Sequence, residues 1–258
     1  LHPCVMMSPS TAAQYLPKKT DIFDVLIIDE ASQMKPEQAF SLIARCKQMI
    51  IVGDQKQLPP SSRFEKDYTN DEMLEDDGEV EYSESILELA DKVIGSKNAL
   101  SLGWHYRSRH TSLIDFSNYY FYDNKLTVFA SNDVGSQVVH KPVENSQYRG
   151  GVNLPEVKAV MDALLEQIKS DKEKSIIIAT MNQQQESEVN LALEAELLKN
   201  KMLRDFDSKH QGNLDELTVK KLEDIQGDER DVVIISTVYG PDADGKITQM
   251  FGDINRAN

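Results

Sequence analysis

Four short runs of the chain consist almost entirely of apolar residues and are rich in Val and Ile. They are residues 24–29 (DVLIID), 48–54 (QMIIVGD), 175–180 (SIIIAT) and 231–237 (DVVIIST). Strands with near-continuous apolar sequences are typical of parallel sheets, whose two faces are both covered by helices. The four runs therefore predict strands that are buried on both faces of parallel sheets.

Helical patterns lie between these runs. Residues 155–170 carry apolar residues at i, i+3, i+4 and i+7, with Pro155 suited to the first turn. Residues 83–94 repeat the pattern, and Ser85 with Glu88 has the spacing of a capping box. A shorter helix is predicted at residues 35–45.

The alternation of strands and helices predicts an α/β fold. An acidic loop and a helix separate the first two strands from the last two. We therefore expect a boundary near residue 97 and two α/β units, residues 1–97 and 98–258.

The net charge of −15 is unusual for a protein that binds nucleic acid. Residues 65–84 alone contribute −9, which leaves −6 for the rest of the chain. Such a run is typical of a solvated, mobile loop, so the net charge neither excludes nor favours nucleic acid. Without a signal peptide or a long apolar run, and with only Cys4 and Cys46, the sequence favours a soluble cytoplasmic protein with reduced thiols.

Acidic and amide groups follow two of the predicted strands. Asp29 and Glu30 end the first, and Gly53 and Asp54 end the second. In an open parallel sheet, ligands bind beyond the carboxyl ends of the strands. An aspartate there can hold Mg²⁺ on nucleotide phosphates, and a neighbouring glutamate can activate water. Asp29 could instead cap the following helix, although this explains only one of the two carboxylates.

Four motifs occur in order: DEASQ, GDQKQLPP, WHYRSRH and EDIQGDERDVVIIS. Together they resemble motifs II, III, IV and V of the superfamily 1 helicases. The branch resembled is that of the nonsense-mediated-decay and replication helicase-nucleases, and within it a group of large bacterial helicases. The resemblance extends over essentially the whole chain, from MSPSTAAQYLP to the end.

The resemblance implies two RecA-like domains of the P-loop NTPase type, with ATP and Mg²⁺ bound between them. By motif, Asp29 would bind Mg²⁺ and Glu30 would activate the attacking water. Gln57 would couple the state of the γ-phosphate to the second domain. Tyr106 would stack on adenine and Arg107 would reach the γ-phosphate. In structural terms Tyr106 could instead be a core aromatic and Arg107 part of an ion pair.

In the last motif, the resemblance implies that Gly227 and Glu229 hold ribose and phosphate. Many relatives carry Arg between these two positions, whereas this chain has Asp228. The acidic residue is unfavourable for a phosphate contact, and GDERD could equally be a charged turn before a strand. His105 and His110 flank the arginine motif without the spacing of metal ligands, and we interpret them as packing or solvent groups.

The resemblance also implies nucleic acid as a partner, with DNA favoured over RNA. Ser8 and Gln14 near the start could donate hydrogen bonds to phosphates. Thr180 and Asn182 after the third strand could do the same. Each could equally be an ordinary loop or cap residue, and the sequence has no basic stripe.

The phosphate-binding loop G-x-x-x-x-G-K-[ST] of such ATPases is absent from the 258 residues. GPDADGKI at residues 240–247 is a near match, but Ile247 replaces the Mg²⁺-binding hydroxyl and two aspartates would repel phosphate. We expect a polar hairpin turn there. The last arginine motif of the family is also missing, so the resemblance implies an internal fragment covering motifs Ic to V, inactive by itself.

Two further functions remain open. The chain could be an interaction module that keeps the helicase fold without the motor, although Asp29, Glu30 and Arg107 argue against such decay. Another P-loop enzyme, such as a kinase, would explain DEASQ but not GDQKQLPP.

Overall fold

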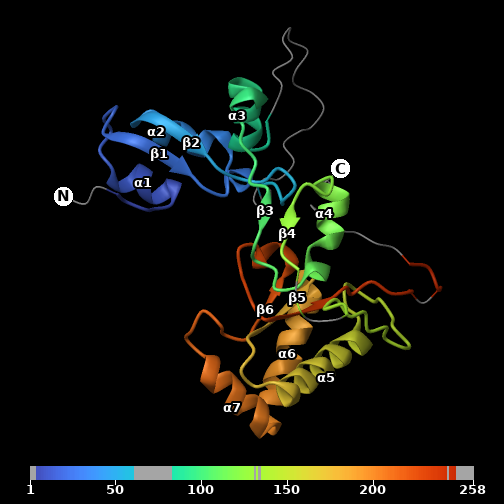
Figure 1. Ribbon diagram of the computed structural model, residues 1–258. Coiled ribbons are helices and arrows are strands. Elements are labelled where there is room, and N and C mark those ends of the chain that lie inside the picture. The colour runs from blue at the N-terminus through green and yellow to red at the C-terminus, as the bar shows by residue number, and fades with distance from the viewer. Residues whose placement is uncertain (1–3, 61–82, 131, 133–134, 243, 248–258) are drawn as a thin grey trace. The chain divides into compact units, whose positions relative to one another are not determined.

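The structure is a computed structural model of the 258-residue chain, and it describes residues 4–60, 83–130, 132, 135–242 and 244–247 (Figure 1). The described residues form two compact units, one up to Val139 and the other from His140. The boundary predicted near residue 97 lies within the first unit, and the assignment of residues 98–139 to a second RecA-like domain stays a prediction. The predicted mobile loop at residues 65–80 lies outside the described residues.

The first unit begins with a β-α-β arrangement. Its parallel strands are paired from Phe23↔Cys46 to Ile28↔Ile51. A separate pair of short parallel strands joins Trp104 to Thr127 and His105 to Val128. In chain order the elements are α1 (Pro9–Tyr15), β1 (Phe23–Ile28), α2 (Pro36–Ile43), β2 (Cys46–Ile51), α3 (Ile86–Ile94), β3 (Trp104–His105), α4 (Asp115–Phe121) and β4 (Thr127–Val128).

The core of the first unit lies on one face of the β1–β2 sheet. Ile28 packs with Ala39 of α2 and Ile86 of α3. The alternate side chains of β1 point the other way, and Val25 and Ile27 are 45% and 64% exposed. The prediction that these strands are buried on both faces is therefore wrong for β1 and β2. In the described residues helices cover only one face of this sheet, so period-2 alternation leaves the other face open.

The second unit contains a three-stranded parallel sheet in the order β6-β5-β7. Figure 1 shows the helices of this unit gathered beside the sheet. The elements are α5 (Leu154–Ser170), β5 (Ile176–Thr180), α6 (Gln183–Lys199), α7 (Lys201–His210), β6 (Thr218–Lys221) and β7 (Val232–Ser236). Here β5 is the central strand and all five of its residues are buried, as predicted.

The core of the second unit is formed where α5, α6 and α7 contact the sheet. Leu164 of α5, Ile178 of β5 and Leu203 of α7 are completely buried in it. Burial of each such side chain stabilises a fold by about 1.5–3 kcal/mol. At the edge strand β7 only alternate residues face this core, so Val233 and Ile235 are exposed. The prediction of two buried faces is wrong for β7 as well.

The predicted helices are confirmed as α2, α3 and α5. The Ser85 hydroxyl caps α3 by accepting a hydrogen bond from the Glu88 backbone N–H at 3.2 Å. The Glu88 carboxylate accepts in return from the backbone N–H of Glu84, one residue earlier than in a standard capping box. The helix therefore begins where the sequence places it, with a shifted reciprocal bond.

Candidate functional site

The two motif loops of the first unit lie against each other at the carboxyl edge of β1 and β2. The Val52 N–H donates to the Ile28 carbonyl at 2.8 Å, and the Ala31 N–H donates to the Val52 carbonyl at 2.9 Å. A Cβ added at Gly53 would lie 3.1 Å from the backbone nitrogens of Ala31 and Ser32. A side chain at this approach would press on the backbone of the first loop, so glycine allows both loops to leave the sheet at one place, as expected for neighbouring parallel strands.

Glu30 has an unusual backbone at this edge. Its φ is +51°, in the left-handed region, which costs free energy for a residue other than glycine. The Asp29 Oδ1 atom accepts a hydrogen bond from the Glu30 N–H at 2.9 Å. The side chain of Gln33 donates to Glu30 Oε2 at 3.4 Å. Both carboxylates are exposed, and the sharp turn presents them to solvent directly after a packed strand.

Asp54 organises the second loop. Its Oδ1 atom accepts from the Lys56 N–H at 2.9 Å. Its Oδ2 atom accepts from the Gln57 side chain at 3.3 Å and from the Tyr122 hydroxyl at 2.5 Å. Burial raises the pKa of Tyr122 above its ordinary value, and the hydrogen bond to Asp54 adds to this effect. Sequence reasoning did not find Tyr122, which is 68 residues from Asp54 in the chain.

Tyr106 and Arg107 lie on the turn that follows β3. Tyr106 is 78% exposed and has no ring partner among the described residues. Arg107 is also exposed and makes no hydrogen bond or ion pair within the described part of the chain. Among the described residues, Tyr106 is therefore not a core aromatic and Arg107 is not part of an ion pair.

In the second unit, Gly227 and Glu229 lie on the loop before β7. Gly227 has a φ of +86°, and no atom lies within 4 Å of an added Cβ. The Asp228 carboxylate accepts from the Lys220 ammonium at 2.7 Å, which ties the loop to β6. The side chain of Glu229 is exposed. Asp228, the residue that departs from the family pattern, therefore has a structural partner of opposite charge.

The residues predicted to contact nucleic acid differ in accessibility. Ser8 caps α1 by accepting from the Thr11 N–H at 3.2 Å, and Gln14 is exposed on the same helix. Thr180 is completely buried and donates to the Asn182 carbonyl at 3.1 Å. Asn182 caps α6 and donates to the Gly151 carbonyl at 3.0 Å. Three of the four thus have local structural bonds, and their role toward nucleic acid stays a prediction.

The near match to a phosphate loop at residues 240–247 is a polar turn, which confirms the prediction. Pro241 and Ile247 form an antiparallel bridge across it. The Asp242 Oδ1 atom accepts from the backbone N–H groups of Asp244 and Lys246, both at 2.9 Å. The chain's own carboxylate thus occupies the donors that a phosphate loop would offer to its ligand.

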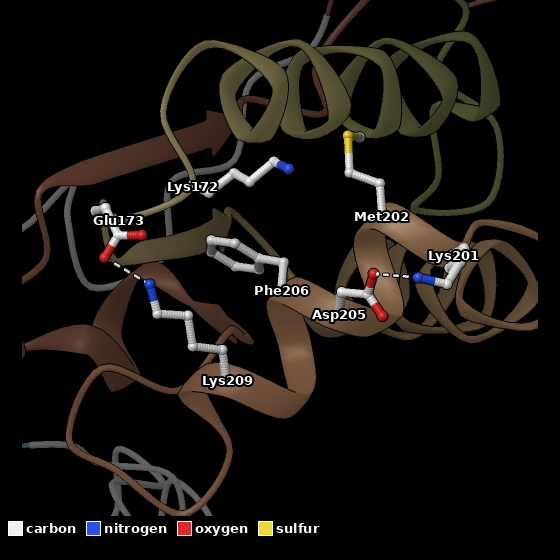
Figure 2. A pocket seen from close by; sticks show the side chains of 7 residues that line it. All are labelled: Lys172, Glu173, Lys201, Met202, Asp205, Phe206 and Lys209. Atoms are coloured by element: carbon white, nitrogen blue, oxygen red, sulfur yellow. Dashed lines mark hydrogen bonds and ion pairs between the residues drawn. The ribbon is translucent and has the colours of Figure 1, made fainter.

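A pocket of about 380 Å³ lies elsewhere in the second unit (Figure 2). Its lining includes Met202, Phe206 and three lysines, Lys172, Lys201 and Lys209. Lys209 is paired with Glu173 at 2.5 Å, and Lys201 is paired with Asp205 at 3.0 Å. The pocket is beside the amino end of β5, and no predicted site residue lines it.

Mg²⁺ fits this site only in part. Asp29 offers Oδ2, since Oδ1 already accepts a backbone hydrogen bond. Within the described residues no three His, Cys, Asp or Glu side chains gather as a metal cluster. A single carboxylate suffices for Mg²⁺ when nucleotide phosphates and water supply the other ligands. The donor chemistry at Asp29 therefore suits a nucleotide-bound metal and does not suit a metal held by protein alone.

In the described ranges no helix combines the length and apolarity needed to cross a membrane.

The parallel sheets and the loops at their carboxyl edges fit an α/β protein of the P-loop NTPase type. Comparison with known families agrees, because residues 4–62 and residues 133–258 each match a model described as an AAA domain.

Proteins similar to this chain carry helicase names. An uncharacterized ATP-dependent helicase of Mycoplasma genitalium is 32% identical over the whole chain, which spans 24% of that protein. Its homolog in Mycoplasma pneumoniae is 33% identical with the same coverage. A probable helicase, senataxin, of Mus musculus is 27% identical over 87% of the chain and 8% of its own length. The chain thus spans about a quarter of the two Mycoplasma relatives.

Proposed function

We propose that this chain is part of an ATP-dependent helicase or translocase of superfamily 1 that acts on nucleic acid, with DNA as the first substrate to test. The observation that carries the proposal is the contact between the two motif loops. Glu30 leaves β1 in a left-handed turn, and Gly53 allows the Asp54 loop to lie against that turn. Exposed acidic and amide groups of two neighbouring strands thereby share one edge of a sheet.

In this proposal each residue has a separate task. Asp29 holds Mg²⁺, Glu30 orients and deprotonates the attacking water, and Gln57 contacts the γ-phosphate. Mg²⁺, when bound, neutralises charge on the phosphate oxygens. Asp54 keeps Gln57 in place through the hydrogen bond at 3.3 Å.

Other parts of the chain complete the nucleotide and nucleic-acid contacts. Tyr106 and Arg107 have no competing partner among the described residues and are available for the base and the γ-phosphate. Gly227 and Glu229 contribute to ribose and phosphate, and Ser8, Gln14 and Asn182 belong to the nucleic-acid surface. Thr180 is completely buried and can act only by holding the Asn182 backbone. The phosphate loop and the last arginine motif are supplied by parts of the same protein outside these 258 residues.

The substitution Glu30→Gln in the full-length protein tests this proposal. The carboxamide keeps the size of the side chain but cannot accept the proton of water, so turnover should fall by two or more orders of magnitude while ATP still binds. Glu37→Gln, on the exposed first turn of α2, is the matched control and should keep full activity. ATP hydrolysis is measured with and without single-stranded DNA and RNA. Absence of turnover in the wild type would favour the non-catalytic interaction module, whereas equal turnover by wild type and Glu30→Gln would show that Glu30 does not activate the water.

A further inference from the structure

The turn that carries Tyr106 and Arg107 is closed by the ring of the residue before them. His105 Nε2 lies 3.1 Å from the backbone nitrogen of Ser108 and 2.7 Å from Ser108 Oγ. The backbone of His105 is itself part of β3, where it pairs with Val128. The ring therefore connects Ser108, at the end of the turn, to β3, the strand that precedes the turn.

The hydrogen bond from the Ser108 N–H selects one tautomer of the neutral His105 ring. A backbone N–H can only donate, so Nε2 must accept from Ser108 and carry no hydrogen of its own. In the neutral ring the hydrogen then lies on Nδ1.

We infer that His105 is a positioning residue for Tyr106 and Arg107. Its unprotonated Nε2 closes the turn and so fixes the direction in which the two side chains leave the backbone. This inference rests on the proposed function, in which these side chains meet the nucleotide. Because neither has a side-chain partner among the described residues, the backbone of the turn is what limits their freedom before a ligand binds.

A second histidine closes the next turn with its other nitrogen. The Nδ1 atom of His110 accepts from the Ser112 N–H at 3.1 Å and lies 2.8 Å from Ser112 Oγ. The Ser112 hydroxyl accepts in turn from the Gln137 N–H at 2.9 Å. The two histidines thus bond a following serine in the same manner, but through ring atoms at different distances from the backbone.

Because Nε2 and Nδ1 are different numbers of bonds from Cα, substitutions by glutamine and asparagine can keep or remove each histidine–serine hydrogen bond. The Oε1 atom of glutamine is as many bonds from Cα as Nε2 of histidine, whereas Oδ1 of asparagine corresponds to Nδ1. His105→Gln should therefore keep the bond to Ser108, and His105→Asn should lose it. At His110 the order reverses, so His110→Asn keeps the bond to Ser112 and His110→Gln does not.

The first measurement needs only the 258-residue chain. Hydrogen exchange of the Ser108 amide, followed by NMR, should be protected in wild type and in His105→Gln. In His105→Asn exchange should be about five-fold faster, the effect of one lost hydrogen bond. The melting temperature of His105→Asn should fall by no more than roughly 2–4 °C, as expected for one hydrogen bond, which excludes global unfolding as the cause. Equal exchange in the two variants would overturn the inference.

The second measurement uses the full-length protein and its ATP hydrolysis. In His105→Asn, kcat should fall on the order of ten-fold, while the KM for nucleic acid is unchanged and His105→Gln restores the rate. Combined with Arg107→Ala, His105→Asn should cause no further loss, because it acts through Arg107. Additive losses would contradict a positioning role. If the wild type shows no Glu30-dependent turnover, the proposed function fails, and the exchange of Ser108 still decides whether His105 holds the turn.

Discussion

The Tyr122 hydroxyl donates a hydrogen bond of 2.5 Å to the Asp54 carboxylate. Asp54 also binds the Gln57 side chain and the Lys56 backbone, so one carboxylate orders its own loop and joins that loop to the segment after α4. Gln57 is the residue proposed to contact the γ-phosphate, so the bond from Tyr122 to Asp54 connects the segment after α4 to the loop that carries Gln57. Removing that contact should affect both stability and the order of the loop.

We expect Tyr122→Phe to destabilise the first unit by about 1 kcal/mol, since the hydrogen bond is to a charged group but only partly buried. The melting temperature should fall by roughly 2–4 °C. Tyr120→Phe is the control, because Tyr120 is exposed and its hydroxyl has no hydrogen-bond partner among the described residues. Differential scanning calorimetry of both variants makes the comparison. Equal melting temperatures would show that the Tyr122 hydroxyl contributes nothing.

The same contact predicts a dependence of stability on pH. Burial, and then the hydrogen bond to Asp54, raise the pKa of Tyr122 in the folded state. A raised pKa means that the folded state binds the proton more tightly than the unfolded state. The stabilisation is therefore complete below the ordinary tyrosine pKa of about 10 and is lost as the pH rises through the folded value. Absorbance titration of the phenolates should show a late component that Tyr122→Phe removes.

A buried polar network predicts the largest loss of stability in the second unit. The Gln185 side chain accepts from the Asn153 backbone N–H at 2.9 Å and donates to Ser236 Oγ at 3.1 Å. The side chains of Gln185 and Asn153 are both completely buried. Gln185→Leu should cost about 2–4 kcal/mol because it leaves these groups unsatisfied. Gln183→Leu, exposed on the same helix, should change the free energy of unfolding by less than about 0.5 kcal/mol. Urea denaturation measures both, and similar midpoints would contradict the prediction.

Two glycines at which an added side chain would not clash allow the cost of backbone strain to be measured alone. An added Cβ meets no atom within 4 Å at either Gly227 or Gly103, but only Gly227 has a positive φ. Gly227→Ala should therefore destabilise the second unit by about 1 kcal/mol. Gly103→Ala should be neutral or slightly stabilising. A comparable loss in both variants, measured by thermal unfolding, would mean that the conformation of Gly227 is not the cause.

The isolated 258-residue chain should show no measurable ATP hydrolysis. Asp29 and Glu30 are exposed carboxylates, and the turn at residues 240–247 already directs its amides to Asp242. No phosphate loop is left to attract the nucleotide, so ATP binding should be weak or absent. Calorimetric titration with Mg-ATP and a phosphate-release assay test this. Turnover that Glu30→Gln abolishes would place the phosphate site within these residues.

The strands with continuous apolar sequences and the strongly periodic helices could be predicted from the sequence. The pattern of β5 required burial on both faces, and α5 followed its 3.6-residue repeat. Short charged strands could not be predicted, because Thr218–Lys221 forms β6 through pairing with β5 and not through its own preference. The exposure of one face of β1 could not be predicted either, because the apolar sequence of this strand does not show whether helices cover one face of the sheet or both.

For the candidate site, the sequence indicated which residues to examine but not what holds them. Asp29 and Asp54 were placed at one edge by the rule for parallel strands, and the approach of Gly53 to Ala31 agrees with that placement. The partners of these residues are distant in sequence or depend on ring geometry, as with Tyr122 on Asp54. His105 was interpreted as a packing or solvent group because neither periodicity nor spacing reveals that its Nε2 atom binds the Ser108 amide.

The order of strands in the second sheet has a consequence for synthesis. The central strand, β5, leaves the ribosome first, and its partners β6 and β7 follow later in the chain. Until Val232 pairs with Ile176, the five residues of β5 lack one of their two neighbours. Pairing over such sequence separations is slow, and an unpaired apolar strand is prone to aggregation. A nascent chain that stalls before Ser236 would therefore present this strand to chaperones, whereas a chain released after it could close the sheet.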